Sequence, residues 1–136
     1  MIQRIQSVWL LIASILTFLT LKFSFYSGIY LPDNQYHQLN GTDNILLMTS
    51  TIALGVLALI NIFLYKTRII QLRLCIVAIL LDLLLVFLYF RALSNFTRGE
   101  YAITAAAHLL IIVSLILAAS GINRDEKLIR SSDRLR

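Results

Sequence analysis

Cysteine, proline, glycine and charged residues are all scarce in this chain of 136 residues, and each shortage excludes a class of protein. The single cysteine, Cys75, excludes an internal disulfide and a Cys-x-x-Cys redox pair. One proline and five glycines argue against collagen, disordered linkers and turn-rich β structure. Charged residues make up 14% of the chain, whereas soluble domains usually carry about 25%. The composition therefore points away from a soluble globular protein.

Long hydrophobic runs are what the sequence has in abundance. Hydrophobic residues make up 59% of the chain, and the mean hydropathy is +0.82. Because a helix crosses the hydrocarbon core in about 20 apolar residues, four stretches qualify as membrane spans: about Ser7–Phe25, Ile45–Tyr65, Ile69–Phe90 and Ala102–Ile122. They are too long for strands and do not alternate cleanly, which argues against a β-barrel. We expect an all-α, four-helix membrane bundle that forms one domain over residues 1–136.

The basic residues predict the orientation, because cytoplasmic loops of membrane proteins are enriched in lysine and arginine. With both termini in the cytoplasm, nine of the twelve basic residues lie inside and only Lys22, Arg91 and Arg98 lie outside. We therefore expect an antiparallel up-and-down bundle with both termini inside, an outer loop over residues 26–44 and a cytoplasmic tail over residues 123–136. The net charge of +5 flanks the apolar runs, so it indicates membrane topology rather than nucleic-acid binding.

Small and polar residues recur on one face of each expected helix, at spacings of three, four and seven. In the second and third spans this face carries Thr51, Gly55, Ala58, Asn61, Gln71, Cys75, Ala78, Asp82 and Tyr89. The first span carries Ser14 and Thr17 on such a face, and the fourth carries His108 and Ser114. Small residues let helix backbones approach, and hydroxyl groups bond between helices. The pattern predicts the packed seam of the bundle.

Asp82 lies alone in the apolar run Ile76–Leu88. A carboxylate at the centre of a membrane helix raises the insertion free energy by roughly 2.5–3.5 kcal/mol, so it is expected to face something polar. From the helix rise, Asp82 lies about 12 Å from the outer end of its span and His108 about 9 Å from the outer end of the next. The two residues are at similar depth on antiparallel helices, so a carboxylate–imidazole pair is geometrically reasonable.

Three interpretations of Asp82 are open. The pair could form a proton relay or cation site in the outer half of the membrane. It could instead be structural, either as a contact with His108 or with a protonated Asp82 that donates to Tyr89, Thr17 or a backbone carbonyl. Asp82 could also meet a basic residue of another subunit. The structural and subunit-contact interpretations together are preferred to the carrier role.

Sequence motifs for catalysis and metal binding are missing. The chain has no glycine-rich phosphate loop, no Gly-x-Ser-x-Gly and no His-Glu-x-x-His. Its two histidines, His37 and His108, are not at the spacing of metal ligands. We therefore expect no enzymatic activity, no metal, no cofactor and no soluble substrate.

The two ends of the chain are expected to form one cytoplasmic surface. Its candidate docking residues are Arg4, Arg130, Asp133, Arg134 and Arg136. Glu126 precedes Arg130 by four residues, which favours a helix that continues past the membrane. The charges suit anionic lipid, or, as a sharper hypothesis, docking onto a cytoplasmic or membrane partner.

The opening Met1–Ser7 and the ending Ile129–Arg136 resemble a family of small four-helix inner-membrane proteins from Bacteroidetes. The similarity covers the whole chain, and these two terminal motifs are its most specific parts. The family is described as a domain of unknown function. The resemblance implies a bacterial inner membrane and four helices, and it supplies no catalytic residues.

Two functional hypotheses follow, and an enzyme is the least favoured third. The first is a non-enzymatic accessory or structural subunit of an inner-membrane complex. It would dock against other subunits or itself through helix faces and cytoplasmic ends. The alternative is a small proton- or cation-coupled transporter or channel that acts as a homodimer. In that hypothesis Asp82 binds the proton or cation and His108 tunes it.

Overall fold

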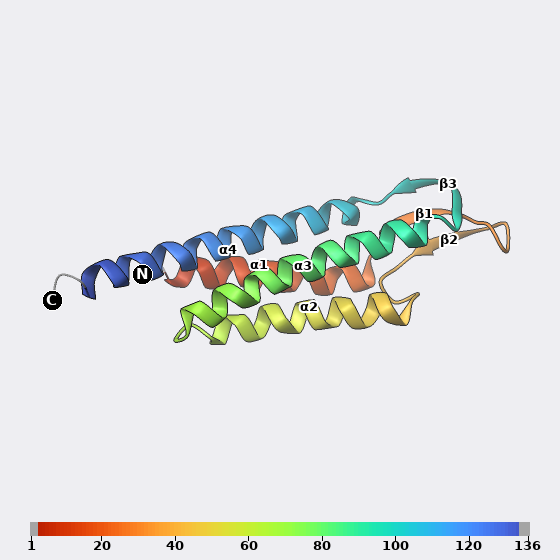
Figure 1. Cartoon of the computed structure of the whole chain (residues 1–136). Helices are drawn as coiled ribbons and strands as arrows, with labels where there is room; N and C mark the ends of the chain where they lie inside the picture. Colours follow the sequence, from red (N-terminus) through yellow and green to blue (C-terminus); the bar gives the residue numbers. More distant parts are fainter. Residues whose placement is uncertain (1–2, 134–136) are drawn as a thin grey trace.

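A computed structural model describes residues 3–133, which form four helices and three strands (Figure 1). The helices are α1 (Gln3–Lys22), α2 (Ile45–Phe63), α3 (Arg68–Leu93) and α4 (Ile103–Asp133). The strands are β1 (Tyr26–Tyr30), β2 (Gln35–Leu39) and β3 (Phe96–Tyr101).

All four helices are long and apolar enough to cross a membrane, as the sequence predicts. Most helix bounds lie within four residues of the expected spans; α1, for example, ends at Lys22 rather than Phe25. The exception is α4, which continues past the expected Ile122 to Asp133. With 31 residues, α4 is about 46 Å long at the usual helical rise. Its last turns therefore project beyond the other three helices (Figure 1).

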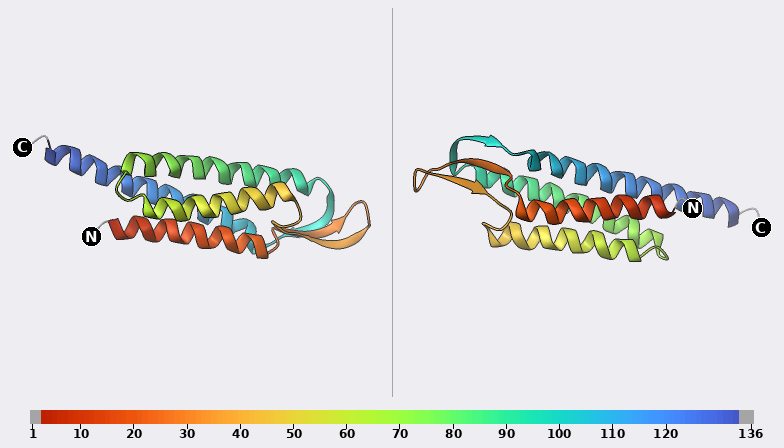
Figure 2. Two further views of the ribbon diagram at one scale, coloured as in Figure 1. Left: turned by 90° about the horizontal axis from the view of Figure 1, so that it is seen from below. Right: turned by 180° about the vertical axis from the view of Figure 1, so that it is seen from behind.

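Each helix packs against its two neighbours around the bundle, so that α1 and α3 both contact α2 and α4. Figure 2 shows both chain termini at one end of the bundle and the strands at the other. We call the first the hairpin end, because residues 64–67 join α2 to α3 there, and the second the sheet end. The up-and-down arrangement agrees with the expected topology of the four spans.

Small and polar side chains fill the interior of the bundle. Along α3 the buried residues are Gln71, Cys75, Ala78, Asp82, Leu85 and Tyr89, in steps of four and three. Along α2 they are Leu47, Thr51, Leu54, Gly55, Ala58 and Asn61. The large apolar side chains mostly point outward. Lipid is as apolar as these side chains, so close packing and interhelical hydrogen bonds hold such a bundle together. The predicted seam on these two helices is confirmed.

Polar contacts join all four helices at the hairpin end. The Gln71 amide donates to the Asn61 carbonyl oxygen at 3.0 Å, and the Asn61 amide donates to the Gln71 carbonyl oxygen at 3.2 Å. The Gln6 amide donates to the buried Asp125 carboxylate at 2.7 Å, and the Arg68 guanidinium lies 4.0 Å from the same carboxylate. These bonds connect α2 with α3, and α4 with α1 and α3.

A three-stranded antiparallel sheet with the order β2-β1-β3 caps the sheet end, and the all-α prediction lacked it. β1 pairs with β2 from Tyr26 opposite Leu39 to Tyr30 opposite Gln35. β3 pairs with the other side of β1, so two connections that are distant in sequence meet above the helix ends. The expected solvated loop over residues 26–44 is therefore mostly a hairpin.

The pairing of β1 with β3 contains a bulge at Gly28. The register shifts between Ser27 and Ile29, and Arg98 in the opposite strand has a φ of 50°. Two residues of β3, Arg98 and Gly99, lie across from Gly28 there. A Cβ on Gly99 would lie 2.7 Å from the Gly28 Cα and would also overlap the Ser27 carbonyl oxygen. This close approach of two backbones requires glycine at position 99.

Gly99→Ala should therefore separate β3 from β1 while leaving the bundle folded. The added methyl group overlaps backbone atoms, which cannot move aside as a flexible side chain can. Hydrogen–deuterium exchange in detergent micelles should show faster exchange of the β1 and β3 amides and unchanged exchange in α2. Glu100→Ala, at the neighbouring exposed position, is the control and should leave the strands protected. Unchanged protection of β1 in Gly99→Ala would contradict the described register.

Candidate functional site

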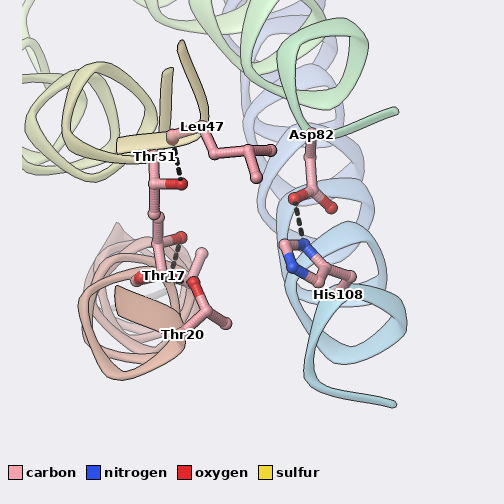
Figure 3. Close-up of polar contacts among 7 residues, drawn as sticks. Thr17, Thr20, Leu47, Thr51, Asp82 and His108 are labelled. Atoms are coloured by element: carbon pink, nitrogen blue, oxygen red, sulfur yellow. Dashed lines mark hydrogen bonds and ion pairs between the residues drawn. The ribbon is translucent and has the colours of Figure 1, made fainter. Parts of the chain in front are cut away.

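Asp82 on α3 and His108 on α4 form a hydrogen-bonded pair inside the bundle (Figure 3). The distance between Asp82 Oδ1 and His108 Nδ1 is 2.8 Å. The two side chains are 0% and 2% exposed. When Asp82 is ionised, His108 Nδ1 must carry the proton of this bond, because a carboxylate only accepts. The structure thus brings together the two residues that the sequence placed at similar depth.

Strand β3 brings His108 to the level of Asp82. Asp82 lies about 16 Å below the end of α3, whereas His108 lies only about 7 Å from the start of α4. The chain leaves α3 above the bundle, and β3 returns from Phe96 to Tyr101, where it pairs with the start of β1. Because the strand runs back toward the bundle, α4 begins lower than α3 ends. The sheet therefore sets the depth of the pair.

Two aromatic rings cover the pair on the side of the sheet. The Phe25 ring stacks on the Tyr89 ring with 4.3 Å between centroids and an interplanar angle of 13°. Both rings contact the His108 imidazole, with centroid distances of 5.8 Å and 5.4 Å. Phe25 and Tyr89 are themselves buried. The pair is therefore shielded from direct contact with the solvent above the bundle.

Phe25 is the site residue that the sequence did not reveal. Its backbone N–H donates to the Leu39 carbonyl oxygen at 2.8 Å, and its own carbonyl accepts from the Ala102 N–H at 3.1 Å. These bonds hold Phe25 between β2 and the start of α4, after α1 has ended at Lys22. In the sequence, Phe25 merely continues an apolar run, and no signal marks it as a ring over the pair.

Thr17 and Tyr89, the other candidate partners of Asp82, have different surroundings. The Thr17 hydroxyl donates to the Ala13 carbonyl oxygen of its own helix at 2.7 Å, away from Asp82 (Figure 3). The Tyr89 hydroxyl is buried close to the Thr51 side chain, without a well-formed hydrogen bond among residues 3–133. It lies against Gly41, where a Cβ would be 2.9 Å from the hydroxyl oxygen. Neither residue hydrogen-bonds to Asp82 in the described part of the chain.

Each residue of the pair has a second polar atom that makes no hydrogen bond to a described residue. Asp82 Oδ2 and His108 Nε2 are both buried and have no partner among the described residues. Buried polar atoms in proteins are nearly always hydrogen-bonded, and exceptions tend to have a functional or structural explanation. The pair thus has one atom free to accept a hydrogen bond and another free to accept or donate one, depending on protonation.

The number of protons on the pair sets the charge in the interior. With one titratable proton, on either Asp82 or His108, the pair is neutral overall. Adding a proton leaves a net charge of +1, and removing it leaves −1. An unpaired charge in a low-dielectric interior costs several kcal/mol. Proton exchange here therefore favours a rearrangement that supplies water or a counter-charge.

The donor set suits a proton better than a metal ion. Across residues 3–133, no group of three or more histidine, cysteine, aspartate or glutamate side chains could hold a metal. A metal ion at the pair would have only Asp82 and His108 as such ligands. The chemistry that these two residues support is hydrogen bonding and proton transfer.

The comparison with protein families finds one match over nearly the whole chain. The model of the family described as Domain of unknown function (DUF4293) matches residues 2–135. The chain belongs to this family. No curated protein and no solved structure matches it. The resemblance expected from the two chain ends is thus confirmed at the level of a family of unknown function, while the Bacteroidetes origin stays a prediction.

The candidate docking residues of this DUF4293 protein lie at the hairpin end. Arg4 is in the first turns of α1, and Arg130 and Asp133 are in the last turns of α4, where their side chains are not described. Arg134 and Arg136 lie outside the described residues. Beside α4 is an open groove of about 560 Å³, lined by Lys66, Thr67, Arg68, Ile69, Ile70, Glu126 and Ile129. The groove combines apolar side chains with two basic residues and one acidic residue, Glu126.

A double-mutant cycle should detect the Asp82–His108 contact. Asp82→Ala and His108→Ala each leave the remaining partner buried and unpaired, so the double variant should lose less than the sum of the two. We expect a coupling free energy of about 1–2 kcal/mol for unfolding in mixed micelles, at the upper end for contacts in membrane proteins.

Asn61→Ala provides the matched control, because Asn61 is buried at the opposite end of the bundle. Its effect and that of Asp82→Ala should add within about 0.5 kcal/mol. A coupling near zero for Asp82 with His108 would mean that the two side chains do not meet in the folded protein.

Proposed function

We propose that this protein is a proton-binding membrane protein whose Asp82–His108 pair takes up and releases a proton on the outer side of the membrane. One observation carries the proposal: the two side chains are 2.8 Å apart, buried, and each has a second polar atom without a partner in the described chain. A small proton-coupled transporter that acts as a homodimer is the function that uses such a pair most directly. A second copy would be needed because the interior of one bundle is filled by its own side chains.

The charge distribution supports placing the sheet end outside. The hairpin end carries Lys66, Arg68, Arg73, Arg124 and Lys127. Near the sheet end, the basic Lys22, Arg91 and Arg98 are accompanied by the acidic Asp33, Asp43 and Glu100. Basic residues are enriched on the cytoplasmic side of membrane proteins. We therefore assign the hairpin end to the cytoplasm, which puts the pair in the outer half of a bacterial inner membrane.

The buried residues between the pair and the hairpin end support proton exchange with the outer side only. Toward the hairpin end, the buried residues next to the pair are mostly small or apolar, among them Leu54, Ala58, Ala78, Leu115 and Ala118. The ionisable side chain that the described residues place in this layer is the Cys75 thiol, whose sulfur accepts from the Asn61 amide on the hairpin side, and no carboxylate or imidazole lies there. In this conformation the pair therefore communicates with the outer side, and release toward the cytoplasm requires a second arrangement of the helices.

Infrared difference spectroscopy after a pH change tests the proposal directly. Protein in lipid nanodiscs should show a carboxyl band that changes with pH and that Asp82→Asn removes. Asn keeps the shape of the side chain and an oxygen that accepts from His108, so the variant should remain folded. Asp125→Asn is the control, since it removes the other buried carboxylate while leaving this band in place. Identical difference spectra for Asp82→Asn and the unaltered protein would overturn the proposal.

A second candidate function is an accessory subunit of an inner-membrane complex, and the projecting end of α4 favours it. α4 passes the other helices beside the groove that contains Lys66, Arg68 and Ile129. An acidic and apolar segment of another membrane protein would complement this surface in charge and polarity. Proton binding and docking are compatible, because they use opposite ends of the bundle.

Deletion of residues 129–136 should release such a partner without affecting the pair. The deletion removes the projecting turns of α4 and one side of the groove, while the contacts of Gln6, Arg68 and Asp125 remain. Purification from native membranes at native expression level should lose a stoichiometric protein that the full chain retains. Arg98→Gln, at the sheet end, is the charge-loss control and should retain it. The same composition in both preparations would argue against docking at this end.

A further inference from the structure

We infer that the proton reaches Asp82 and His108 by a defined route, from an outer pocket beneath the sheet, past the loop over residues 40–44, to the Tyr89 hydroxyl and then the pair. Tyr89 is the relay in this route, and Gly41 keeps the space beside its hydroxyl open. The inference rests on the proposed proton-binding function and adds how the site is reached.

The route begins in a pocket of about 280 Å³ between the sheet and the ends of α2 and α3. Its polar lining includes Tyr30, His37, Asp43, Asn44 and Asn95. His37 and Asp43 are exposed, so the pocket exchanges protons with the solvent. The titratable groups of the pocket thus lie close to the sheet end of the bundle.

A tight turn links this pocket to the interior. The Asn40 N–H donates to Asp43 Oδ2 at 2.7 Å, and the Asp43 N–H donates to the Asn40 carbonyl oxygen at 3.2 Å. These two bonds hold the Asp43 carboxylate at the pocket and turn Gly41 inward, where it is buried against Tyr89. The turn therefore has a solvent-facing carboxylate on one side and the Tyr89 hydroxyl on the other.

The Tyr89 hydroxyl lies between the two carboxylates of the route. Asp43 is two residues from Gly41, which packs against the hydroxyl, and Asp82 is about two helical turns from Tyr89 along α3. On the side of α4, a pocket of about 260 Å³ reaches His108, but its lining is apolar apart from His108 and Tyr101 and includes the Phe25 ring that stacks on Tyr89. A proton that enters from the outer pocket therefore passes the hydroxyl group rather than the aromatic faces.

Unpartnered polar atoms mark the whole route independently. Within residues 3–133, five buried side-chain polar atoms have no hydrogen-bond partner. Four of them follow the route: Asn40 Oδ1, the Tyr89 hydroxyl, Asp82 Oδ2 and His108 Nε2. The fifth, Asn61 Oδ1, is near the hairpin end. Ordered water commonly bridges buried polar groups of this kind, and here it would connect the four atoms in series.

The transfer is balanced at each step. The Tyr89 oxygen accepts one proton from the pocket side as it gives its own to the water that bridges to Asp82 Oδ2 or His108 Nε2. Tyr89 ends as the neutral phenol, and the pair gains one proton. On the inner faces of α1 and α2, the buried polar residues around the route are Thr17, Thr20 and Thr51, which do not titrate. The titratable groups of the route are therefore Tyr30, His37, Asp43, Tyr89, Asp82 and His108.

A pH jump followed by time-resolved infrared detection of the Asp82 carboxyl tests the route. Tyr89→Phe removes only a hydroxyl near Thr51, and the Thr51 hydroxyl keeps its bond to the Leu47 carbonyl oxygen, so the fold should be kept. Proton uptake by Asp82 should slow by about 100-fold, the lower end of what a positioned proton-transfer group contributes. The extent of uptake at equilibrium should be unchanged. Tyr26→Phe, at a buried tyrosine of the sheet that is not on the route, should have the rate of the unaltered protein.

Two further variants test the entrance. Asp43→Asn keeps an oxygen that accepts from the Asn40 N–H but removes the titratable group, so it should slow uptake. Gly41→Ala places a methyl group 2.9 Å from the Tyr89 hydroxyl and 3.2 Å from the Thr20 carbonyl oxygen, and should slow it as well. Unchanged rates in Tyr89→Phe and Asp43→Asn, with normal uptake at equilibrium, would overturn the route and leave the proposed function standing. No uptake by Asp82 in the unaltered protein would overturn both.

Discussion

A carboxylate inside a bundle that crosses lipid must find its hydrogen-bond partner within the protein, because hydrocarbon offers none. Here the partner of Asp82 is His108 at 2.8 Å. This constraint explains much of the sheet end. For His108 to reach Asp82, α4 must begin nearer the middle of the bundle than α3 ends, and β3 returns the chain to that level. Phe25 and Tyr89 then separate the pair from the solvent at the sheet end. The sheet is thus part of the architecture that positions the pair, not only a cap over it.

The buried polar groups at the two ends of the bundle differ in their hydrogen bonding. At the hairpin end the bonds are reciprocal: Asn61 and Gln71 each donate to the other's carbonyl oxygen, and Gln6 and Arg68 both approach Asp125. Such contacts connect helices and leave little capacity for change. At the hairpin end one buried atom, Asn61 Oδ1, lacks a partner among the described residues, whereas at the sheet end both titratable residues of the pair have such an atom. That contrast is the reason for assigning structure to the first end and proton chemistry to the second.

The sequence predicts the helical part well, because helix periodicity and span length are local properties. The small and polar faces of α2 and α3, including Thr51, Gly55, Ala78 and Asp82, are buried as expected. The sheet depends on pairing between β1 and β3, which lie far apart in sequence and meet because α1 and α3 end, and α4 begins, at the same end of the bundle. Phe25 was missed for a related reason, since its place over the pair depends on where α1 ends. The sequence also could not predict that Asp82 Oδ2 and His108 Nε2 lack partners, because this depends on the three-dimensional packing around them.

Nitrogen-15 NMR of the histidine rings in lipid nanodiscs tests the central claim most directly. The chain has two histidines, and a His37→Gln variant assigns the remaining signal to His108. The claim predicts that His108 Nδ1 carries a proton shared with Asp82, that the Nε2 signal changes with pH, and that Asp82→Asn alters this response. His37 is exposed, so its signal in the unaltered protein provides the comparison with a solvent-accessible histidine. An Nε2 signal of His108 that stays constant while that of His37 changes would show that the pair is a fixed structural contact and contradict the account.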